Sequence, residues 1–210
     1  MTESNIILRD YKDSDYKDCE ALANGAWQFD DNFKPQELSD IAKHICTTGA
    51  LVASNFRKVI ESNGEVIGFL FGFNNMSARP KKVMLFGLST VFRMLCAKGI
   101  KFSEKITLLQ AINTHEKNRL QVVDRGKSEI LLFVVDPSHH GCGYGKRLLS
   151  EFTIRCKRSG AKSIIVDTNT LGASRFYENA GFKHIGDFHS PLHEYATKGG
   201  QACMYEYTHE

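Results

Sequence analysis

Residues 129–146 read EILLFVVDPSHHGCGYGK, a sequence that predicts a strand, a loop and a helix in succession. The apolar run at 130–135 predicts a buried strand, which Asp136 and Pro137 bring to an end. A loop with three glycines follows, and a helix is expected to begin near Lys146. Glycine adopts positive φ readily and lets a ligand approach the backbone closely. Because the first N–H groups of a helix have no partner inside it, this loop predicts an anion site, for which diphosphate is the usual occupant.

Two common phosphate-binding loops fit this stretch poorly. A P-loop has a glycine separated by four residues from Gly-Lys and a Ser or Thr directly after it, but His140 and Arg147 stand at those places. The dinucleotide fingerprint requires a third glycine where Lys146 stands. The loop therefore indicates a different class of diphosphate ligand.

Two motifs resemble those of the GNAT superfamily of acyl-CoA N-acyltransferases. The first is VDPSHHGCGYG at 135–145, which is similar to the family's strand exit followed by R/Q-x-x-G-x-G/A, with His140 in place of the usual Arg or Gln. The second is ASRFYENAGF at 173–182, which is similar to the family's A-x-x-[LF]-Y-x-x-x-G-F block. The two motifs occur in the family's order and span less than a third of the chain.

The resemblance implies an α/β (α+β) fold with a mixed, mostly antiparallel central sheet, flanked by helices, in which a central pair of parallel strands splays apart. The rest of the sequence predicts strands and helices in an order that agrees with this fold. A strand at 6–9, a helix capped near Asp13 or Ser14 and a helix from Pro35 to Gly49 come first. Asn-Gly at 63–64 predicts a hairpin. Later strands are expected at 163–167, 182–188 and 202–208, with helices at 146–160 and 173–179.

One domain is expected over 1–210, with a helical insertion at about 76–127. Apolar residues at helical spacing over 84–95 predict one helix, and Ser103 can cap a second that reaches about Ile112. Three interpretations stay open: helices packed on the sheet, a lid or dimer surface beside the acceptor, or a membrane-surface helix. The last is considered because the apolar face is flanked by Lys81, Lys82, Arg93, Lys98 and Lys101. Residues 113–127 are polar, and we expect them to be mobile.

By resemblance, acetyl-CoA is the cosubstrate, held through its diphosphate by the glycine loop and through its pantetheine between the splayed strands. The expected cofactor contacts are Val134, Val135, His140, Gly141, Cys142, Gly143, Tyr144, Gly145, Lys146, Asn169 and Ala173. Asn169 lies one position from the family's asparagine, and Thr170 occupies the usual place. Cys142 could suggest a covalent acyl-enzyme, but its place in the diphosphate loop favours a small loop residue instead.

Tyr177 and Glu129 are the expected catalytic residues. Tyr177 matches the family tyrosine that lies beside the thioester sulfur, and a phenol can protonate the departing thiolate. The alternative is that Tyr177 only packs against Phe176. Glu129 stands where histone acetyltransferases of this superfamily carry a glutamate base, although a Glu at the start of a strand is often simply solvated. A base is needed because an amine of pKa about 10 is protonated at pH 7.

Composition excludes several other classes. A net charge of +3 and the lack of an aromatic-interleaved basic run argue against nucleic-acid binding. The six cysteines show no metal-ligand spacing and His139–His140 has no partner ligand nearby, so we expect no metal and free thiols in the cytoplasm. No apolar run is long enough for a membrane span.

These observations predict an N-acetyltransferase that moves an acetyl group from acetyl-CoA to a primary amine, on a small molecule or a peptide, in a ternary complex. A homodimer is left open. Two alternatives come from other classes: a non-catalytic CoA-binding sensor or interaction domain, and a membrane- or partner-docking protein built on the inserted helices. The amine itself and the acyl group are not encoded in any recognisable motif.

Overall fold

The computed structural model describes residues 5–77, 82–124, 126–196 and 200–209. Within these residues one sheet has the strand order β1-β2-β3-β4-β5-β7-β6. The strands are β1 (Ile6–Asp10), β2 (Phe56–Ser62), β3 (Glu65–Phe73), β4 (Ser128–Val135), β5 (Ser163–Asn169), β6 (Lys183–Phe188) and β7 (Ala202–Thr208). The β4–β5 pair is parallel, and the other neighbouring strands are antiparallel.

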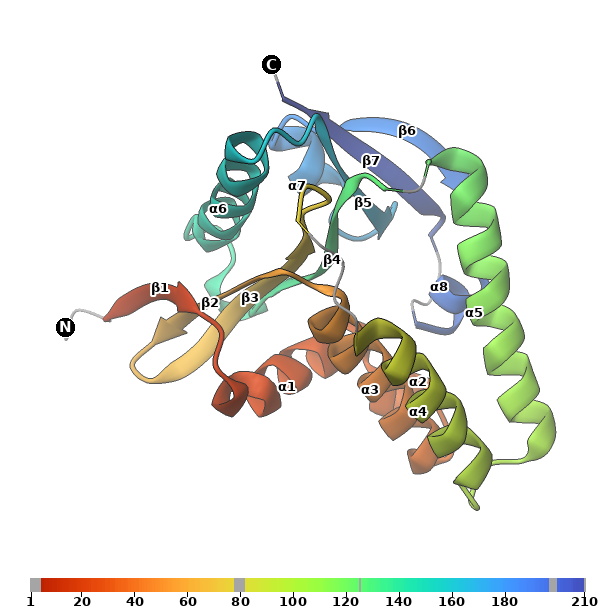
Figure 1. Ribbon diagram of the computed structural model, residues 1–210. Coiled ribbons are helices and arrows are strands. Elements are labelled where there is room, and N and C mark those ends of the chain that lie inside the picture. The colour runs from red at the N-terminus through yellow and green to blue at the C-terminus, as the bar shows by residue number, and fades with distance from the viewer. Residues whose placement is uncertain (1–4, 78–81, 125, 197–199, 210) are drawn as a thin grey trace.

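Helices cover both faces of this sheet, and further helices pack on those. They are α1 (Tyr16–Trp27), α2 (Phe29–Asn32), α3 (Gln36–Ala53), α4 (Lys82–Cys96), α5 (Phe102–Val122), α6 (Tyr144–Arg158), α7 (Ser174–Asn179) and α8 (Pro191–Ala196). Figure 1 shows α6 on one side of the sheet, α1 and α3 on the other, and α5 as a long helix along the edge that carries β6.

The core follows from the alternation of side chains along the strands. On the α6 face, Ile67 and Leu70 of β3 pack with Leu148 and Phe152 of α6. On the opposite face, Phe69 and the neighbouring β3 and β4 residues pack against α1 and α3. Because both faces are covered, β3 is apolar almost throughout and does not alternate with polar residues. The predicted fold class is confirmed, including the Asn-Gly hairpin between β2 and β3.

Three segments differ from the sequence-based expectations. Helix α3 continues past Gly49 to Ala53, because Ala50 is buried in the core. Helix α5 continues to Val122 instead of giving way to a mobile stretch after Ile112. In this added part of α5, the side chains that face inward include His115 and Arg119. Because the buried face is polar, the sequence shows no apolar periodicity there. Helix α8 lies where only a proline-containing loop was expected.

Helix α4 packs mainly on α3 rather than on the sheet. It buries Thr90 and Met94, whereas most of its large apolar side chains are exposed. Lys81, one of the cations expected to flank the apolar face of this helix, lies outside the described residues. No described helix is long and apolar enough to cross a bilayer. The exposed large apolar residues of α4 are Met84, Leu85, Leu88, Val91, Phe92 and Leu95.

Candidate active site

Strands β4 and β5 pair over only two positions, Ser128 with Ile164 and Glu129 with Ile165. On its other side, β4 stays paired with β3 as far as Val135. The β3–β4 register shifts at Leu131, which has no Cα partner in that register, and a bulge of this kind bends its strand. The bulge coincides with the point where β4 and β5 separate. The expected splay of the central parallel pair is therefore present, and it begins directly after Glu129.

The glycine loop follows the end of β4 and leads into α6. Gly141 and Gly143 have φ of 80° and 82°, in the left-handed region that favours glycine. Gly143 is the N-cap of α6, and no side chain caps this helix. The His140 ring bonds back to the Val135 carbonyl at 2.9 Å, which anchors the loop to β4. Gly141 and Gly143 are exposed, so the uncapped start of α6 faces solvent, as an anion site requires.

Phe176 joins this loop to the second motif. Its ring lies edge-on to Phe133 of β4, with centroids 5.6 Å apart. A Cβ at Gly145 would come within 3.2 Å of the same ring, so a larger residue there would crowd Phe176. The end of β4, the start of α6 and helix α7 are therefore packed together around one aromatic side chain.

Tyr177 is buried in the core cluster on the α6 face. Its ring contacts Phe176 and Phe182 edge-on, each with a centroid separation of 5.4 Å. Among the described residues, none forms a hydrogen bond with its hydroxyl. Burial, assisted by the charge of Asp167, raises the pKa of Tyr177, so the phenol stays protonated at neutral pH.

Glu129 lies at the last paired position before the two strands separate. The Arg119 guanidinium, from α5, donates a hydrogen bond to Glu129 Oε1, and these side chains are 9% and 19% exposed. Burial raises the pKa of Glu129 to about 7, although the Arg119 charge acts in the opposite direction. A carboxyl with this pKa exchanges protons readily near neutral pH, which suits a general base.

The remaining expected cofactor contacts differ in exposure. Val134 is buried, and Val135 and Tyr144 are partly buried. Cys142, Lys146 and Ala173 are exposed. Asn169 ends β5, and its side-chain oxygen accepts a hydrogen bond from the Leu171 N–H at 2.8 Å. The structure thus brings the loop, the end of β4 and α7 together. Glu129 lies apart from them, about 20 Å from Val135 along β4 by the rise of a strand.

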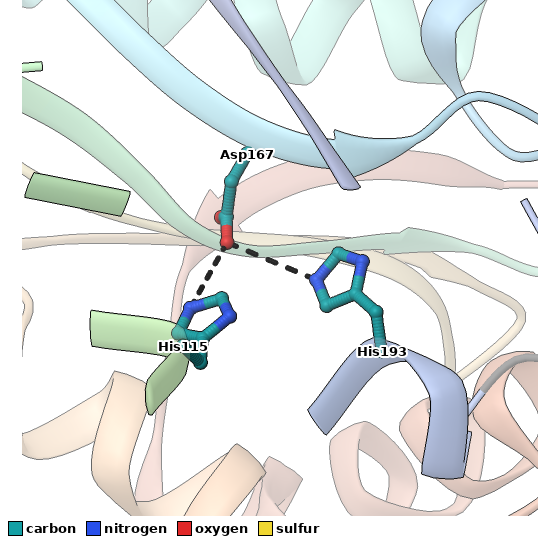
Figure 2. A group of neighbouring side chains, drawn as sticks. All are labelled: His115, Asp167 and His193. Carbon is teal, nitrogen blue, oxygen red and sulfur yellow. Dashed lines mark ion pairs between the residues drawn. The ribbon is translucent and has the colours of Figure 1, made fainter. Parts of the chain in front are cut away.

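A second polar group lies on the far side of β5 from α6 and α7. Figure 2 shows His115 from α5 and His193 from α8, both turned toward the Asp167 carboxylate of β5. Burial lowers the pKa of His115, against the opposing charge of Asp167. The Asp167 charge also raises the pKa values of Glu129 and Tyr177, so this group lies within electrostatic range of both expected catalytic residues. No sequence spacing could reveal it, because its members come from three separate elements.

Comparison with known proteins agrees with this architecture. Residues 108–184 match the family model described as an acetyltransferase (GNAT) domain, which runs from within α5 through the glycine loop, α6 and α7 to the start of β6. The sequence matches no curated protein. The match therefore falls on the part of the chain that holds both motifs, and the family it identifies is the one that those motifs resemble. Acetyl transfer is the general chemistry of that family.

Solved structures share the fold across nearly the whole chain. An agmatine N-acetyltransferase, in a mutant apo form, has a TM-score of 0.60 at 14% identity, covering 98% of this chain and 100% of that one. The putative acetyltransferase yncA from Salmonella typhimurium, solved with acetyl-CoA, has a TM-score of 0.54 at 16% identity, covering 98% and 94%. Ard1 from Thermoplasma volcanium has a TM-score of 0.52 at 17% identity, covering 97% of each chain. At these identities the likeness establishes the fold alone.

Proposed function

We propose that this protein is an N-acetyltransferase that moves the acetyl group of acetyl-CoA directly to a primary amine. One observation carries the proposal: the Phe176 ring contacts Phe133 at the end of β4 and the Tyr177 ring, and it lies beside Gly145 at the uncapped start of α6, next to the point where β4 and β5 separate. The yncA structure contains acetyl-CoA, which supports the choice of donor for this fold.

In the proposed reaction the diphosphate binds the glycine loop, and pantetheine lies between the separated strands. A backbone N–H near Val134 or Val135 donates a hydrogen bond to the developing oxyanion, and one such donor is worth about 3 kcal/mol. The amine nitrogen attacks the acetyl carbon, the C–N bond forms and the C–S bond breaks. Glu129 takes the amine proton through a chain of water molecules, because it lies about 20 Å along β4 from Val135. Tyr177 gives a proton to the thiolate sulfur and is reprotonated from solvent.

The raised pKa of Tyr177 is compatible with this role. Burial disfavours a thiolate in the same way as a phenolate, and the leaving sulfur would share that surrounding. Cys156, in the same apolar cluster, illustrates the effect, since burial raises its pKa to about 11. Burial therefore raises the pKa of the phenol and the pKa of the thiol together, so a thiolate in this cluster is a stronger base toward Tyr177 than it would be in solution.

The test is acetyl transfer to a panel of amines. Agmatine belongs in the panel because a protein of this fold is named for it, together with a polyamine, an aminoglycoside and a lysine peptide. Free CoA should be measured by chromatography, since Cys96 and Cys142 are exposed and would react with thiol reagents. Amine-dependent CoA release is expected. Acetyl-CoA binding without release for any amine would favour the non-catalytic sensor instead.

We propose a second role for α4, as an amphipathic helix that rests on an anionic lipid surface. Its apolar face is exposed, with Met84 at 72% and Phe92 at 69%. Lys82, Lys98 and Lys101 are exposed at its two ends, and residues 82–103 contain no acid. Such a helix combines apolar burial with attraction to anionic lipid.

Flotation with vesicles of phosphatidylglycerol and phosphatidylcholine tests this role. Binding is expected to require the anionic lipid and to be lost in Phe92→Glu. Leu171→Glu, at another exposed apolar position, serves as the control. Failure to float would overturn the role, as would a dimer in solution that Phe92→Glu dissociates.

A further inference from the structure

Three potential metal ligands from separate elements converge beside β5. His115 Nε2 lies 3.4 Å from Asp167 Oδ2, and His193 Nε2 lies 3.9 Å from the same oxygen. One ligand atom from each residue lies within 4.8 Å of the others. Figure 2 shows the two rings approaching the carboxylate from helices that lie opposite each other.

These separations are close to those of a tetrahedral site. Zinc bonds of about 2.0–2.1 Å to nitrogen and oxygen put tetrahedral ligand atoms roughly 3.3 Å apart. The two separations from Asp167 Oδ2 are therefore near the required value, and small side-chain rotations would close the remaining gap. Two imidazoles and one carboxylate are also a ligand set that zinc takes in proteins, with the fourth position open.

The surrounding contacts orient the first histidine for this role. His115 Nδ1 lies 2.8 Å from Ser190 Oγ, and this hydrogen bond leaves Nε2 directed at Asp167. Metal-bound histidines are normally held in this way through their other ring nitrogen. Ser190 Oγ also accepts a hydrogen bond from the His193 N–H at 3.0 Å, so one hydroxyl links both histidine-bearing segments.

A cation near this group, Arg119, already pairs with acidic side chains. Arg119 lies one turn after His115 on α5, and its charge acts on His115. Its guanidinium pairs with Glu129 and lies 3.8 Å from a Glu116 oxygen, so the acids around it outnumber it. Electrostatics in this region therefore do not oppose an added divalent cation.

We propose that His115, Asp167 and His193 bind a divalent transition-metal ion, with Zn²⁺ as the best fit. The ion would tie α5 and α8 to β5 and so fix the inserted helix against the sheet. This departs from the sequence-based expectation of no metal, which rested on the spacing of the six cysteines and on His139 and His140. Those two histidines lie beside the glycine loop, where His140 is exposed and bonded to the Val135 carbonyl.

The test is metal binding by the untagged protein after treatment with a chelating resin. Calorimetry with Zn²⁺ is expected to give one equivalent and a raised Tm. Co²⁺ should give the visible bands of a tetrahedral site, without the near-ultraviolet charge-transfer band of thiolate ligands. That distinction matters because the protein has six free cysteines.

His115→Ala and Asp167→Asn should each weaken Zn²⁺ binding by about a hundredfold. Loss of a group that only supports a ligand costs about 10- to 100-fold, and loss of a ligand itself should cost at least the upper value. His184→Ala is the matched control, because His184 and Asp187 form an exposed 2.7 Å pair outside this group. If either variant fails to fold, His193→Gln on the short α8 takes its place. Unchanged affinity in the folded variants, less than one equivalent, or a thiolate spectrum would each overturn the proposal.

Discussion

Replacing Tyr177 by Phe separates catalysis from packing. The substitution removes only the hydroxyl, which forms no hydrogen bond among the described residues, and it keeps the ring contacts with Phe176 and Phe182. The free energy of unfolding should therefore change by less than about 1 kcal/mol. Loss of a general acid usually lowers a rate by about 10²–10⁴. We expect kcat to fall at least about tenfold, equivalent to ~1.4 kcal/mol in the barrier.

The assay is CoA release at saturating amine and acetyl-CoA, with the affinity for acetyl-CoA measured separately. That affinity should change little. Tyr205→Phe is the matched control. The ring centroid of Tyr205 lies 6.5 Å from that of Tyr177, and the Tyr205 hydroxyl donates a hydrogen bond to Glu178 Oε1 at 2.8 Å. The control should lose some stability and keep its turnover. Unchanged kcat in Tyr177→Phe, or equal losses in both variants, would refute Tyr177 as the acid.

Three further predictions follow from the same structure. Because the base must be deprotonated, kcat/KM should rise with pH through about 7, which is the pKa of Glu129. The Glu129→Gln variant should lose this rise, and the control variant Glu116→Gln should keep it. Gly143→Asp should abolish acetyl-CoA binding in a folded protein, since its carboxylate would occupy the N-cap of α6 and repel the diphosphate; normal binding would remove the loop from the donor site. Asp15 has a pKa lowered by its bonds to Arg9, against burial, so its contribution to stability is present above pH ~4 and is lost as pH falls through the folded-state pKa. Denaturant unfolding at pH 7 should show Asp15→Asn destabilised by about 2–3 kcal/mol, with the exposed Asp10→Asn nearly neutral; equal effects would contradict this.

Much of the fold could be predicted because its signals are local. The apolar run of β4, the glycines before α6 and the Asn-Gly turn between β2 and β3 each fix a backbone conformation from neighbouring residues. The splay of β4 and β5 came from the family resemblance, and its physical mark, the register shift at Leu131, depends on pairing with a distant strand.

The polar groups around the expected base could not be predicted in the same way. Arg119 reaches Glu129 only because α5 continues past Ile112, and the inward side of that extension is polar. His193 stands on a helix of six residues that begins at Pro191, where the sequence indicates a loop. Hydrophobic periodicity reports apolar faces, so a helix that buries charged and imidazole groups escapes it.

Calorimetry of the protein with acetyl-CoA, free CoA, ATP and NAD in parallel tests the donor site directly. The glycine loop and separated strands predict micromolar binding of acetyl-CoA, alone or together with CoA, and no binding of ATP or NAD. Failure to bind either CoA species would contradict the donor site at the start of α6.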